Sequence, residues 1–463
     1  MTVTGATPSL AADLRRIVGD DAVLTGPATA PYETDGTEGR GLRGMPDAVV
    51  IPRTPEAVAQ LIGWAAQRGV PLVPRGGGTG LAGGAVPVGG GVVVSLARLG
   101  AIHEIAPESW RLSVGAAVTT ANVRRLAREN ELFFPPDPGA SEQSQIGGNV
   151  ATNAGGPHAF KYGSTGTWVT GIEAAMASGR LVSVGGDQRK DVGGYDIKSL
   201  LVGSEGTLGI ITAVTLRLLP APEAVLPLVA FFSDAEVGCA AAANVIASGI
   251  EAAALDYLDG AALEIVRRAY PGNVPRAARF VLISEVDGPH EEAARQIQEL
   301  RARFAGSALS TDTPTVSDIW RWRDGISGAV STTRGGKVSE DIFVPVARLA
   351  DAIRGVEEIG NELGLETCTW GHAGDGNLHA SFLLDRNIPG ELDLANDAAD
   401  RLFSLAVQLG GGVTGEHGIG WVKRGQLARQ WSEGAIVLHE QIKQAFDPLG
   451  ILNPGKKVAR LVT

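Results

Sequence analysis

The chain has 463 residues, of which 44% are apolar and 20% are charged, and its formal net charge is −11 at pH 7. This length predicts about two or three compact lobes, and the apolar content is ample for buried cores. The negative charge, without any run of lysine and arginine, argues against a nucleic-acid-binding protein. Because Cys239 and Cys368 are the only cysteines, the chain can build neither a disulfide framework nor an iron–sulfur cluster.

Residues 1–19 have no apolar core of signal-peptide length, and no stretch reaches the roughly 18 apolar residues that a spanning helix needs. We therefore expect a cytoplasmic protein without a transmembrane segment. Peripheral association with a membrane is the alternative.

The first half of the chain alternates helical and strand patterns. Helices are predicted at residues 10–19, 54–69 and 119–132, and strands at 47–52, 71–78, 92–96, 111–118, 171–177 and 180–186. Residues 199–220 read as a strand-forming run interrupted by a glycine turn, and the proline-rich corner at 133–141 cannot be a helix or a central strand. This pattern indicates an α/β lobe.

The second half changes character after residue 221. Strands at 226–232 and 279–286 alternate with long amphipathic helices at 234–249 and 291–305. This order predicts an α+β domain with an antiparallel sheet and helices on one face. A last helix from residue 437 ends at Asp447 and Pro448 and is followed by a turn.

Two glycine-dense segments carry the strongest chemical signal. Residues 74–84 read PRGGGTGLAGG and residues 145–156 read QIGGNVATNAGG. Consecutive glycines let the backbone approach a pyrophosphate closely and point several N–H groups at its oxygens. We interpret both segments as turns that hold a flavin dinucleotide.

The first glycine segment also contains a misleading pattern. Gly78, Gly80 and Gly83 match GxGxxG, and Glu104 follows at about the spacing of a Rossmann fingerprint. A Rossmann turn opens a helix, whereas here Pro87 and further glycines lead into the apolar run 92–96. We therefore expect the cofactor loop to connect two strands.

A second group of chemically active residues lies in GHAGDGNLHASF and GVTGEHGIG, which contain His372, His379, Glu416 and His417. Alternation along a strand places His379 on the same face as Asn377, and His372 precedes a turn, so the two imidazoles could converge across a hairpin. By spacing alone this is a weak metal signature, and hydrogen-bonded core histidines are the ordinary alternative.

Six ordered segments resemble one family: PRGGGTGLAGG, PPDPGASEQSQIGGNVATNAGG, VGSEGTLGIITAVTLRLLP, WGHAGDGNLH, GEHGIG and DPLGILNPGK. They are similar to the vanillyl-alcohol-oxidase-type flavoproteins, and within them to the FAD-linked D-2-hydroxyacid dehydrogenases. That branch comprises glycolate oxidase catalytic subunits, D-lactate dehydrogenases and D-2-hydroxyglutarate dehydrogenases. The resemblance spans roughly residues 43–458.

The resemblance implies an α+β chain with a two-lobed FAD-binding domain and an α+β substrate (cap) domain that has an antiparallel sheet. We expect an N-terminal helix and linker at 1–42, the FAD-binding domain at 43–221, the cap domain with a metal site at 222–440, and a segment returning to the FAD domain at 441–463. The first loop offers no histidine of the kind to which related flavoproteins attach FAD. Noncovalent FAD is therefore expected.

The FAD contacts that the resemblance implies fall in four parts of the sequence. The expected residues are Pro74, Arg75, Gly76, Gly77, Gly78, Thr79, Gly80, Leu81, Pro136, Asp137, Ser141, Ile146, Gly147, Gly148, Asn149, Thr152, Asn153, Glu205, Gly206, Gly209, Ile210 and Asn453.

The resemblance also implies that His372, His379 and Glu416 bind a divalent metal and that His417 is the catalytic base. Hydride transfer from a 2-hydroxyacid requires the hydroxyl to lose its proton, and zinc lowers the pKa of bound water from about 15.7 to about 7. A histidine, with a reference pKa of about 6.5, suits the role of proton acceptor. Two imidazoles and a carboxylate suit zinc, manganese or iron(II) comparably.

Substrate carboxylates need local cations, and the resemblance points to Arg323 with Ser327 as a clamp, with Lys337 and Asn377 as further substrate residues. Ser327 replaces the usual threonine, and Lys337 aligns with the family's lysine only across a gap. A substrate with one carboxylate, D-lactate or glycolate, therefore stands beside D-2-hydroxyglutarate.

Two other functions are alternatives. A non-redox flavoprotein of the alkyl-transferring synthase type would keep the flavin loops but normally has a different histidine cluster, and a metal-dependent hydrolase would leave the flavin half unused. The expected partners are a small 2-hydroxyacid and an external electron acceptor, either a quinone, an electron-transfer flavoprotein, a cytochrome or oxygen. A homodimer is a candidate assembly.

Overall fold

The computed structural model describes residues 8–457. The chain divides into two compact units: unit 1 contains the chain up to residue 155, residues 164–221 and the chain from residue 417, and unit 2 contains residues 156–163 and 222–416. This division passes between Glu416 and His417, whereas the sequence predicted a boundary at residue 440. It also assigns residues 156–163 to unit 2, away from their neighbours in sequence.

Unit 1 contains a four-stranded sheet in the order β1-β2-β4-β3, in which β2, β4 and β3 are parallel. Its elements are α1 (Pro8–Val18), β1 (Val23–Leu24), β2 (Ala48–Val50), α2 (Pro55–Arg68), β3 (Leu72–Arg75) and β4 (Val92–Ser95). Helix α2 begins where the Thr54 side chain accepts a hydrogen bond from the N–H of Ala57, and it ends at Gly69 with φ of 62°. Strands β3 and β4 flank the first glycine segment, as expected.

A second, antiparallel sheet of unit 1 has the order β5-β6-β10-β8-β9. The remaining elements of this unit are β5 (Ile102–Ala106), β6 (Arg111–Gly115), α3 (Thr120–Arg128), β7 (Leu132–Phe133), α4 (Ile146–Thr152), β8 (Val169–Ala175), β9 (Leu181–Gly185), α6 (Ile197–Leu201), β10 (Ile210–Arg217), β11 (Leu219–Pro220), α14 (Leu427–Gln430) and α15 (Glu433–Phe446).

Two expectations about unit 1 were wrong. The second glycine segment is not a turn throughout, because residues 146–152 form α4, whose end at Asn153 adopts a left-handed conformation. The run at 199–220 begins with α6, because the Asp196 side chain accepts a hydrogen bond from the N–H of Ser199 and starts a helix. Strand β10 follows only after the glycine turn.

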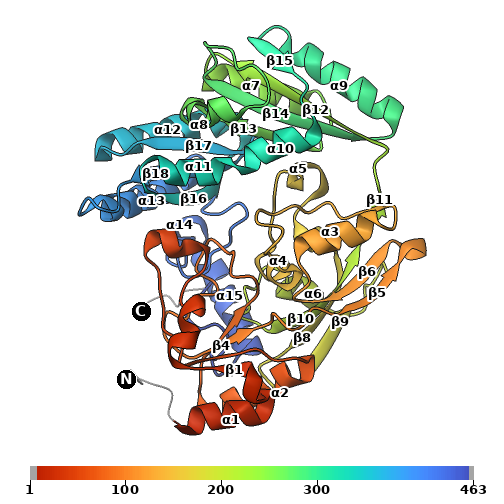
Figure 1. Ribbon diagram of the computed structural model, residues 1–463, viewed down its shortest axis with the longest axis vertical. Helices are drawn as coiled ribbons and strands as arrows, with labels where there is room; N and C mark the ends of the chain where they lie inside the picture. Colours follow the sequence, from red (N-terminus) through yellow and green to blue (C-terminus); the bar gives the residue numbers. More distant parts are fainter. Residues whose placement is uncertain (1–7, 458–463) are drawn as a thin grey trace. The chain divides into compact units, whose positions relative to one another are not determined.

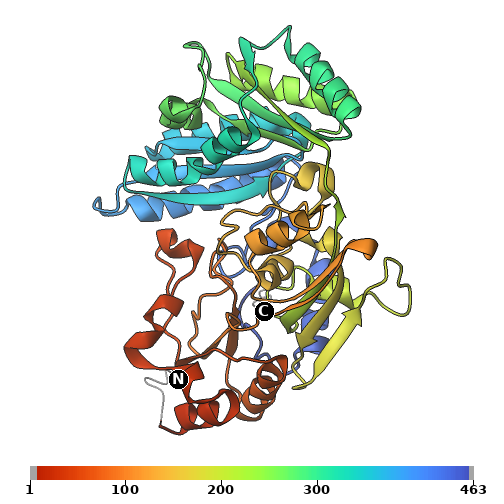
Figure 2. The ribbon, with the colours of Figure 1, turned by 45° about the vertical axis from the view of Figure 1, so that its right-hand side comes forward.

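Unit 2 is built on a seven-stranded antiparallel sheet in the order β15-β12-β14-β13-β17-β18-β16. Strands from the green and the blue parts of the chain thus share one sheet, and helices lie against it in both views (Figures 1 and 2). The elements are α5 (Ala159–Tyr162), β12 (Ala224–Phe232), α7 (Ala235–Ala247), β13 (Ala254–Leu258), α8 (Gly260–Val266), β14 (Phe280–Gly288), α9 (His290–Phe304), β15 (Ser310–Asp312), α10 (Val316–Asp324), α11 (Ile326–Thr333), β16 (Gly336–Phe343), α12 (Leu349–Leu363), β17 (Thr367–His372), β18 (Asn377–Leu384) and α13 (Glu391–Gln408).

Helices cover both faces of this sheet, so the expectation of helices on one face was wrong. One face, which includes Leu258 and Trp370, packs against apolar residues of α8, α10 and α11. The other face carries Phe232, whose ring meets Phe304 of α9 edge-on, and α7, α12 and α13 also pack against the sheet. The physical reason is that consecutive residues of β14 and β18 are buried and include the apolar runs 280–283 and 382–384, which require cover on both sides.

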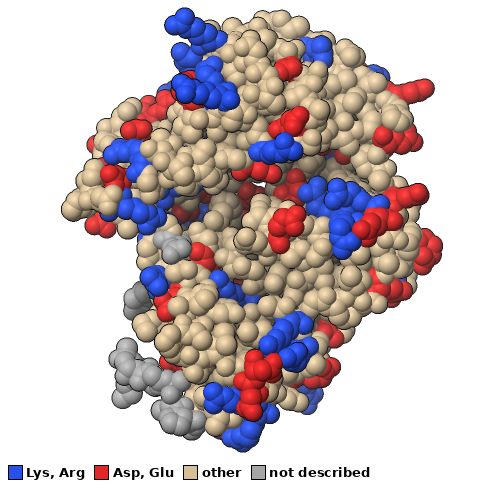
Figure 3. Space-filling model, viewed as in Figure 1, with Lys and Arg blue, Asp and Glu red and all other residues tan. Residues whose placement is uncertain are grey.

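The surface of each unit mixes both signs of charge on the face that Figure 3 shows, with Lys and Arg interspersed among Asp and Glu. Within residues 8–457, no helix combines the length and the apolar character that crossing a membrane requires.

Candidate functional site

A cavity in unit 1 is formed by segments that are distant in sequence. Its lining includes Pro74, Arg75, Gly76, Gly77, Gly78, Thr79, Gly80, Gly147, Gly148, Asn149, Thr152, Glu205, Gly206, Gly209 and Ile210, all of which the sequence analysis named as FAD contacts. His417, expected as the base, also lines this cavity.

Glycine is required in both glycine segments for close packing. A Cβ on Gly77 would stand 2.1 Å from the backbone oxygen of Gln143, and a Cβ on Gly147 would stand 2.5 Å from the Cβ of Ala116. The loop is therefore pressed directly against neighbouring backbone. The amide groups of residues 77–80 donate to no other residue in the described part of the chain, so they are free to bind an anion.

Gln145 adds a side chain that sequence reasoning missed. It lines the cavity, and its buried Oε1 has no hydrogen-bond partner among residues 8–457. A cofactor that presents a hydrogen-bond donor would satisfy this atom. The residues present therefore fit a flavin dinucleotide, with free amides for the pyrophosphate and an open acceptor for a ring N–H. The position of Gln145 directly before the GGN sequence could have drawn attention to it.

Several expected FAD residues lie outside the lining. These are Leu81, Pro136, Asp137, Ser141, Ile146, Asn153 and Asn453, whereas Ala82, Gly84, Ala85, Leu96, Ala151 and Ile211 line the cavity without having been expected. The Leu81 side chain is 42% exposed. Asn153 instead accepts hydrogen bonds from Ser164 and from the N–H of Gly166.

Asn453 and Glu205 make hydrogen bonds that connect separate segments of unit 1. The Asn453 amide donates to the backbone oxygens of Gly84 and Glu205 and so ties two cavity segments together. The Glu205 carboxylate accepts the N–H groups of Ile419 at 2.9 Å and of Gly420 at 2.6 Å. Glu205 therefore holds the turn on which His417 lies.

The metal-type cluster lies in unit 2, on the hairpin of β17 and β18. Trp370 pairs with His379 and His372 pairs with Asn377, so both imidazoles lie on the same face, with ring centroids 5.5 Å apart. Gly376 makes the tight turn possible, with φ of 78° and no room for a Cβ beside the backbone oxygen of Val344.

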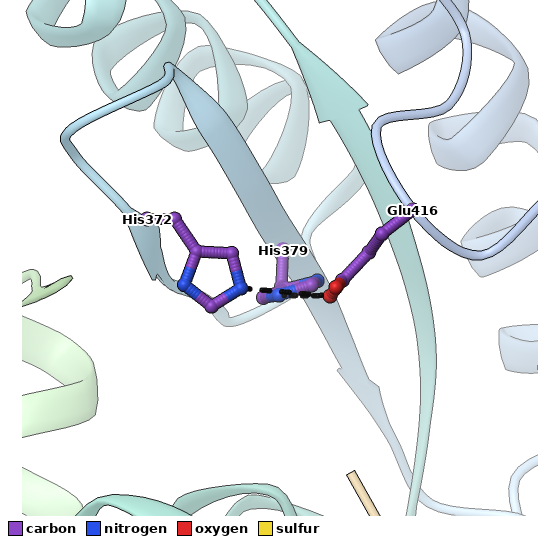
Figure 4. Close-up of side chains that lie close together, drawn as sticks. All are labelled: His372, His379 and Glu416. Atoms are coloured by element: carbon purple, nitrogen blue, oxygen red, sulfur yellow. Dashed lines mark ion pairs between the residues drawn. The ribbon is translucent and has the colours of Figure 1, made fainter. Parts of the chain in front are cut away.

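Glu416 reaches the two histidines from the segment after α13. Its Oε1 is 3.2 Å from Nε2 of His379 and 3.6 Å from Nε2 of His372 (Figure 4). One ligand atom from each residue lies within 4.8 Å of the others. Atoms at about 2.0–2.1 Å from a tetrahedral zinc ion are separated by about 3.3–3.4 Å, which is close to the two distances to the carboxylate.

Unit 2 orients both kinds of ligand through buried carboxylates. Asp256 accepts from Nδ1 of His372 at 2.7 Å and from Nε of Arg323 at 2.7 Å. Asp341 accepts the N–H groups of Gly415 at 2.5 Å and Glu416 at 2.7 Å, which fixes the backbone of the third ligand. Nε2 of His372 is buried and has no hydrogen-bond partner among the described residues. A metal ion would satisfy this atom, so the residues fit a dication.

The charges of the cluster also favour a cation. Burial raises the pKa of Glu416, but the neighbouring imidazoles of His372 and His379 outweigh it and hold this pKa well below its ordinary value. Burial disfavours the imidazolium of His372, yet Asp256 and Glu416 raise the pKa of His372 well above its ordinary value. Glu416 is thus ionised at neutral pH. A metal ion would take the place of the proton that the carboxylates attract to His372.

The expected substrate residues separate into two groups. Arg323 bonds Asp256, and its buried Nη2 has no partner within residues 8–457. Within residues 8–457, Ser327 makes no hydrogen bond to Arg323. Instead, Nζ of Lys337 donates to Ser327 O at 2.9 Å and Oγ at 2.8 Å, and it also lies over the Trp370 ring. Lys337 and Ser327 thus lie close together, although Lys337 aligns with the family's lysine only across a gap.

Asn377, which was expected to contact substrate, packs against two neighbouring segments. Its side-chain amide donates to the backbone oxygen of Ile342 at 2.9 Å. A Cβ on Gly415 would stand 1.9 Å from Nδ2 of Asn377, so this amide packs directly against the segment that carries Glu416.

Two protein-family models match this chain. Residues 46–185 match the FAD binding domain, and residues 221–457 match the C-terminal domain of FAD linked oxidases. The chain is 35% identical to glycolate oxidase subunit GlcD of Bacillus subtilis over 423 residues, which cover 90% of each chain. It is 38% identical to a D-lactate dehydrogenase of Archaeoglobus fulgidus over 418 residues, 89% of this chain and 91% of the relative.

Solved structures show the same fold at lower identity. The chain matches p-cresol methylhydroxylase with a TM-score of 0.81 and 18% identity, covering 98% of this chain and 97% of the other. It matches alkyldihydroxyacetonephosphate synthase with a TM-score of 0.78 and 17% identity, covering 98% and 87%. These two likenesses establish the vanillyl-alcohol-oxidase-type fold. Together with the domain matches and the curated relatives, they show that this chain belongs to the FAD-linked D-2-hydroxyacid dehydrogenase family of oxidoreductases.

Proposed function

We propose that this protein oxidises a D-2-hydroxyacid to the 2-oxoacid, using noncovalent FAD and a divalent metal, with His417 as the base. The observation that carries the proposal is the continuity of Glu416 and His417 in the chain. Glu416 belongs to the metal-type cluster, and His417 lines the flavin cavity. Consecutive Cα atoms are about 3.8 Å apart across a trans peptide, so the metal-type cluster and the flavin cavity contain residues that are adjacent in the chain.

When bound, FAD supplies a hydride acceptor and the dication lowers the pKa of the substrate hydroxyl. The free amides of residues 77–80 would bind the pyrophosphate, and Gln145 would accept a hydrogen bond from the flavin ring. His372, His379 and Glu416 would hold the metal. His417 would take the proton of the substrate hydroxyl, and bound FAD would supply the two-electron acceptor for the hydride that leaves the α-carbon, so that the oxidation balances.

We favour a substrate with one carboxylate, such as D-lactate or glycolate. The unpartnered Nη2 of Arg323 offers one buried cationic donor, and Arg323 lies close enough to Glu416 for their charges to interact. Relatives carry the names glycolate oxidase and D-lactate dehydrogenase. The second candidate is a dicarboxylate such as D-2-hydroxyglutarate, and the proximity of Lys337 to Ser327 supports it.

Electrons leave the reduced flavin for an external acceptor. Cys239 and Cys368 are both buried free thiols and cannot hold an iron–sulfur cluster between them. A quinone, an electron-transfer flavoprotein, a cytochrome or oxygen would serve, and the protein is proposed to deliver electrons to one of these.

The test is anaerobic mixing of the purified yellow protein with D-lactate, glycolate, D-2-hydroxyglutarate and the L-enantiomers, followed by flavin absorbance. We expect bleaching by a D-acid or glycolate, and suppression by a chelator that re-added metal reverses. Reduction that is insensitive to chelation would remove the metal from the mechanism. A flavin that no hydroxyacid bleaches would favour the alkyl-transferring synthase alternative.

Replacement of the base gives a sharper test. We expect His417→Ala to retain its yellow colour and to reduce its flavin about 10²–10⁴ times more slowly, because general-base catalysis is typically worth that factor. His103→Ala is the matched control, since His103 is an exposed residue of unit 1. Rapid reduction by His417→Ala would place the base elsewhere.

A further inference from the structure

We propose that Asp256 is a positioning residue for metal binding, which orients His372 so that Nε2 faces the ion. This inference rests on the proposed function, because it assigns a role to a residue that touches a proposed ligand. Asp256 lies on β13, and its side chain is fully buried. No motif in the sequence singles it out, and it lies 116 residues before His372.

The sheet register brings the two residues together. Strands β13 and β17 pair antiparallel, and Asp256 is the direct partner of His372 in this pairing. Side chains of directly paired residues project from the same face, at the distance where they interact most strongly. The carboxylate therefore meets the imidazole because of strand pairing and needs no flexible loop to reach it.

The hydrogen bond determines which imidazole nitrogen can bind a cation. Asp256 Oδ1 lies 2.7 Å from Nδ1 of His372, which places the donor hydrogen on Nδ1. When a metal ion takes the place of the proton on Nε2, this nitrogen would present its lone pair to the ion, and it is the buried atom that lacks a hydrogen-bond partner among the described residues. A carboxylate bonded to the far nitrogen of a metal-binding histidine fixes the tautomer and the ring orientation and makes the imidazole more basic.

The second oxygen of Asp256 is also held in place. Its Oδ2 accepts from Nε of Arg323 at 2.7 Å, so both carboxylate oxygens have partners and the group cannot rotate freely. The same carboxylate thus orients a proposed metal ligand and the arginine proposed to bind the substrate carboxylate. A buried ion pair by itself is weak evidence for stability, because desolvation offsets the attraction between the charges. The hydrogen-bond geometry of Asp256 instead supports a role in positioning His372 and Arg323.

The experiment compares zinc binding by the full-length, FAD-loaded protein and its Asp256→Asn variant, using competition with a chromophoric chelator. We expect the dissociation constant for Zn²⁺ to rise about 10- to 100-fold in the variant, the usual effect of losing such a partner. Bound FAD should be unchanged, because the flavin cavity is lined by unit 1 residues. Asp259→Asn is the matched control: Asp259 is also buried and hydrogen-bonded, but it caps α8 and bonds Thr369, away from the ligands.

A second measurement needs no change to Asp256. The chain has seven histidines, few enough for ¹⁵N-histidine NMR of the zinc-loaded protein, with His372→Gln identifying the signal. We expect Nδ1 of His372 to keep its proton and Nε2 to show the shift of a metal-bound nitrogen. Metal bound through Nδ1 would overturn the inference even if Asp256→Asn failed to fold.

The outcomes separate the two proposals. Equal Zn²⁺ affinity of Asp256→Asn and the unaltered protein would overturn the positioning role and leave the proposed function standing. An equal loss of affinity in Asp256→Asn and Asp259→Asn would show a general effect of buried carboxylates and would also overturn it. An unaltered protein that binds neither Zn²⁺ nor Mn²⁺ would remove the metal from the proposed function, and the inference with it.

Discussion

Replacement of Gly77 by alanine tests whether the first glycine loop holds the cofactor. The new Cβ would stand 2.1 Å from the backbone oxygen of Gln143 and 3.0 Å from its carbonyl carbon. Non-bonded heavy atoms attract at about 3.5–4.0 Å, so the loop must move by about 1 Å or more. The Cβ is attached directly to the loop backbone and the atoms that it meets are backbone, so no side chain can rotate away to relieve the contact.

Overpacking of this kind costs about 1–3 kcal/mol. If the displacement moves the amides of residues 77–80 away from the pyrophosphate, a loss of this much binding free energy raises the dissociation constant for FAD about 5- to 150-fold. Apoprotein titrated with FAD, followed by quenching of flavin fluorescence, measures this constant directly. We expect Gly77→Ala to be isolated with little bound flavin.

Gly89→Ala is the matched control. Gly89 lies between the same two strands, has nothing within 4 Å of an added Cβ, and does not line the cavity. It should bind FAD as the unaltered chain does. Unchanged affinity in Gly77→Ala would refute the reasoning, because it would show that the loop either yields without cost or does not contact the cofactor.

Two further predictions follow from buried charge. Glu205→Gln places an amide nitrogen against one of the N–H groups of residues 419–420, so one hydrogen bond to a charged group is lost. Such a bond is worth about 1.5–3 kcal/mol, and its loss should lower the melting temperature and slow flavin reduction. Unchanged values in both assays would show that Glu205 does not hold this turn. Burial lowers the pKa of Lys337 to about 8 from its ordinary 10.5, so acylation of this amine, measured by mass spectrometry, should be half-maximal near pH 8. Between pH 8 and 10.5 the unfolded chain binds more protons than the folded chain, so the free energy of unfolding should rise with pH through this window. A labelling midpoint near 10.5 would show that Lys337 is solvated.

Local patterns in the sequence were sufficient for part of the candidate site. The first glycine loop could be placed between two strands because Pro87 and its neighbouring glycines exclude a helix at that point. His372 and His379 could be placed on one face because a strand alternates with a period of two and a short turn joins the strands. These features depend on residues that are close in sequence.

Other local readings failed where tertiary contacts decided the outcome. Residues 146–152 form a helix although they contain adjacent glycines. Gly147 fits there because it packs against Ala116, a contact that no local propensity encodes. The cover on both faces of the large sheet likewise depends on α8, α10 and α11, three helices that were not predicted from the sequence.

The sequence by itself determined the family, the two glycine-rich segments and the residue types available for acid–base and metal chemistry. Only the tertiary structure decided that Glu416 meets the two histidines, that His417 lines the flavin cavity, and that Asp256 lies behind His372. The physical reason is that these contacts are made by strand pairing and chain reversal between residues tens to more than a hundred positions apart. No periodicity in a single stretch of sequence carries that information.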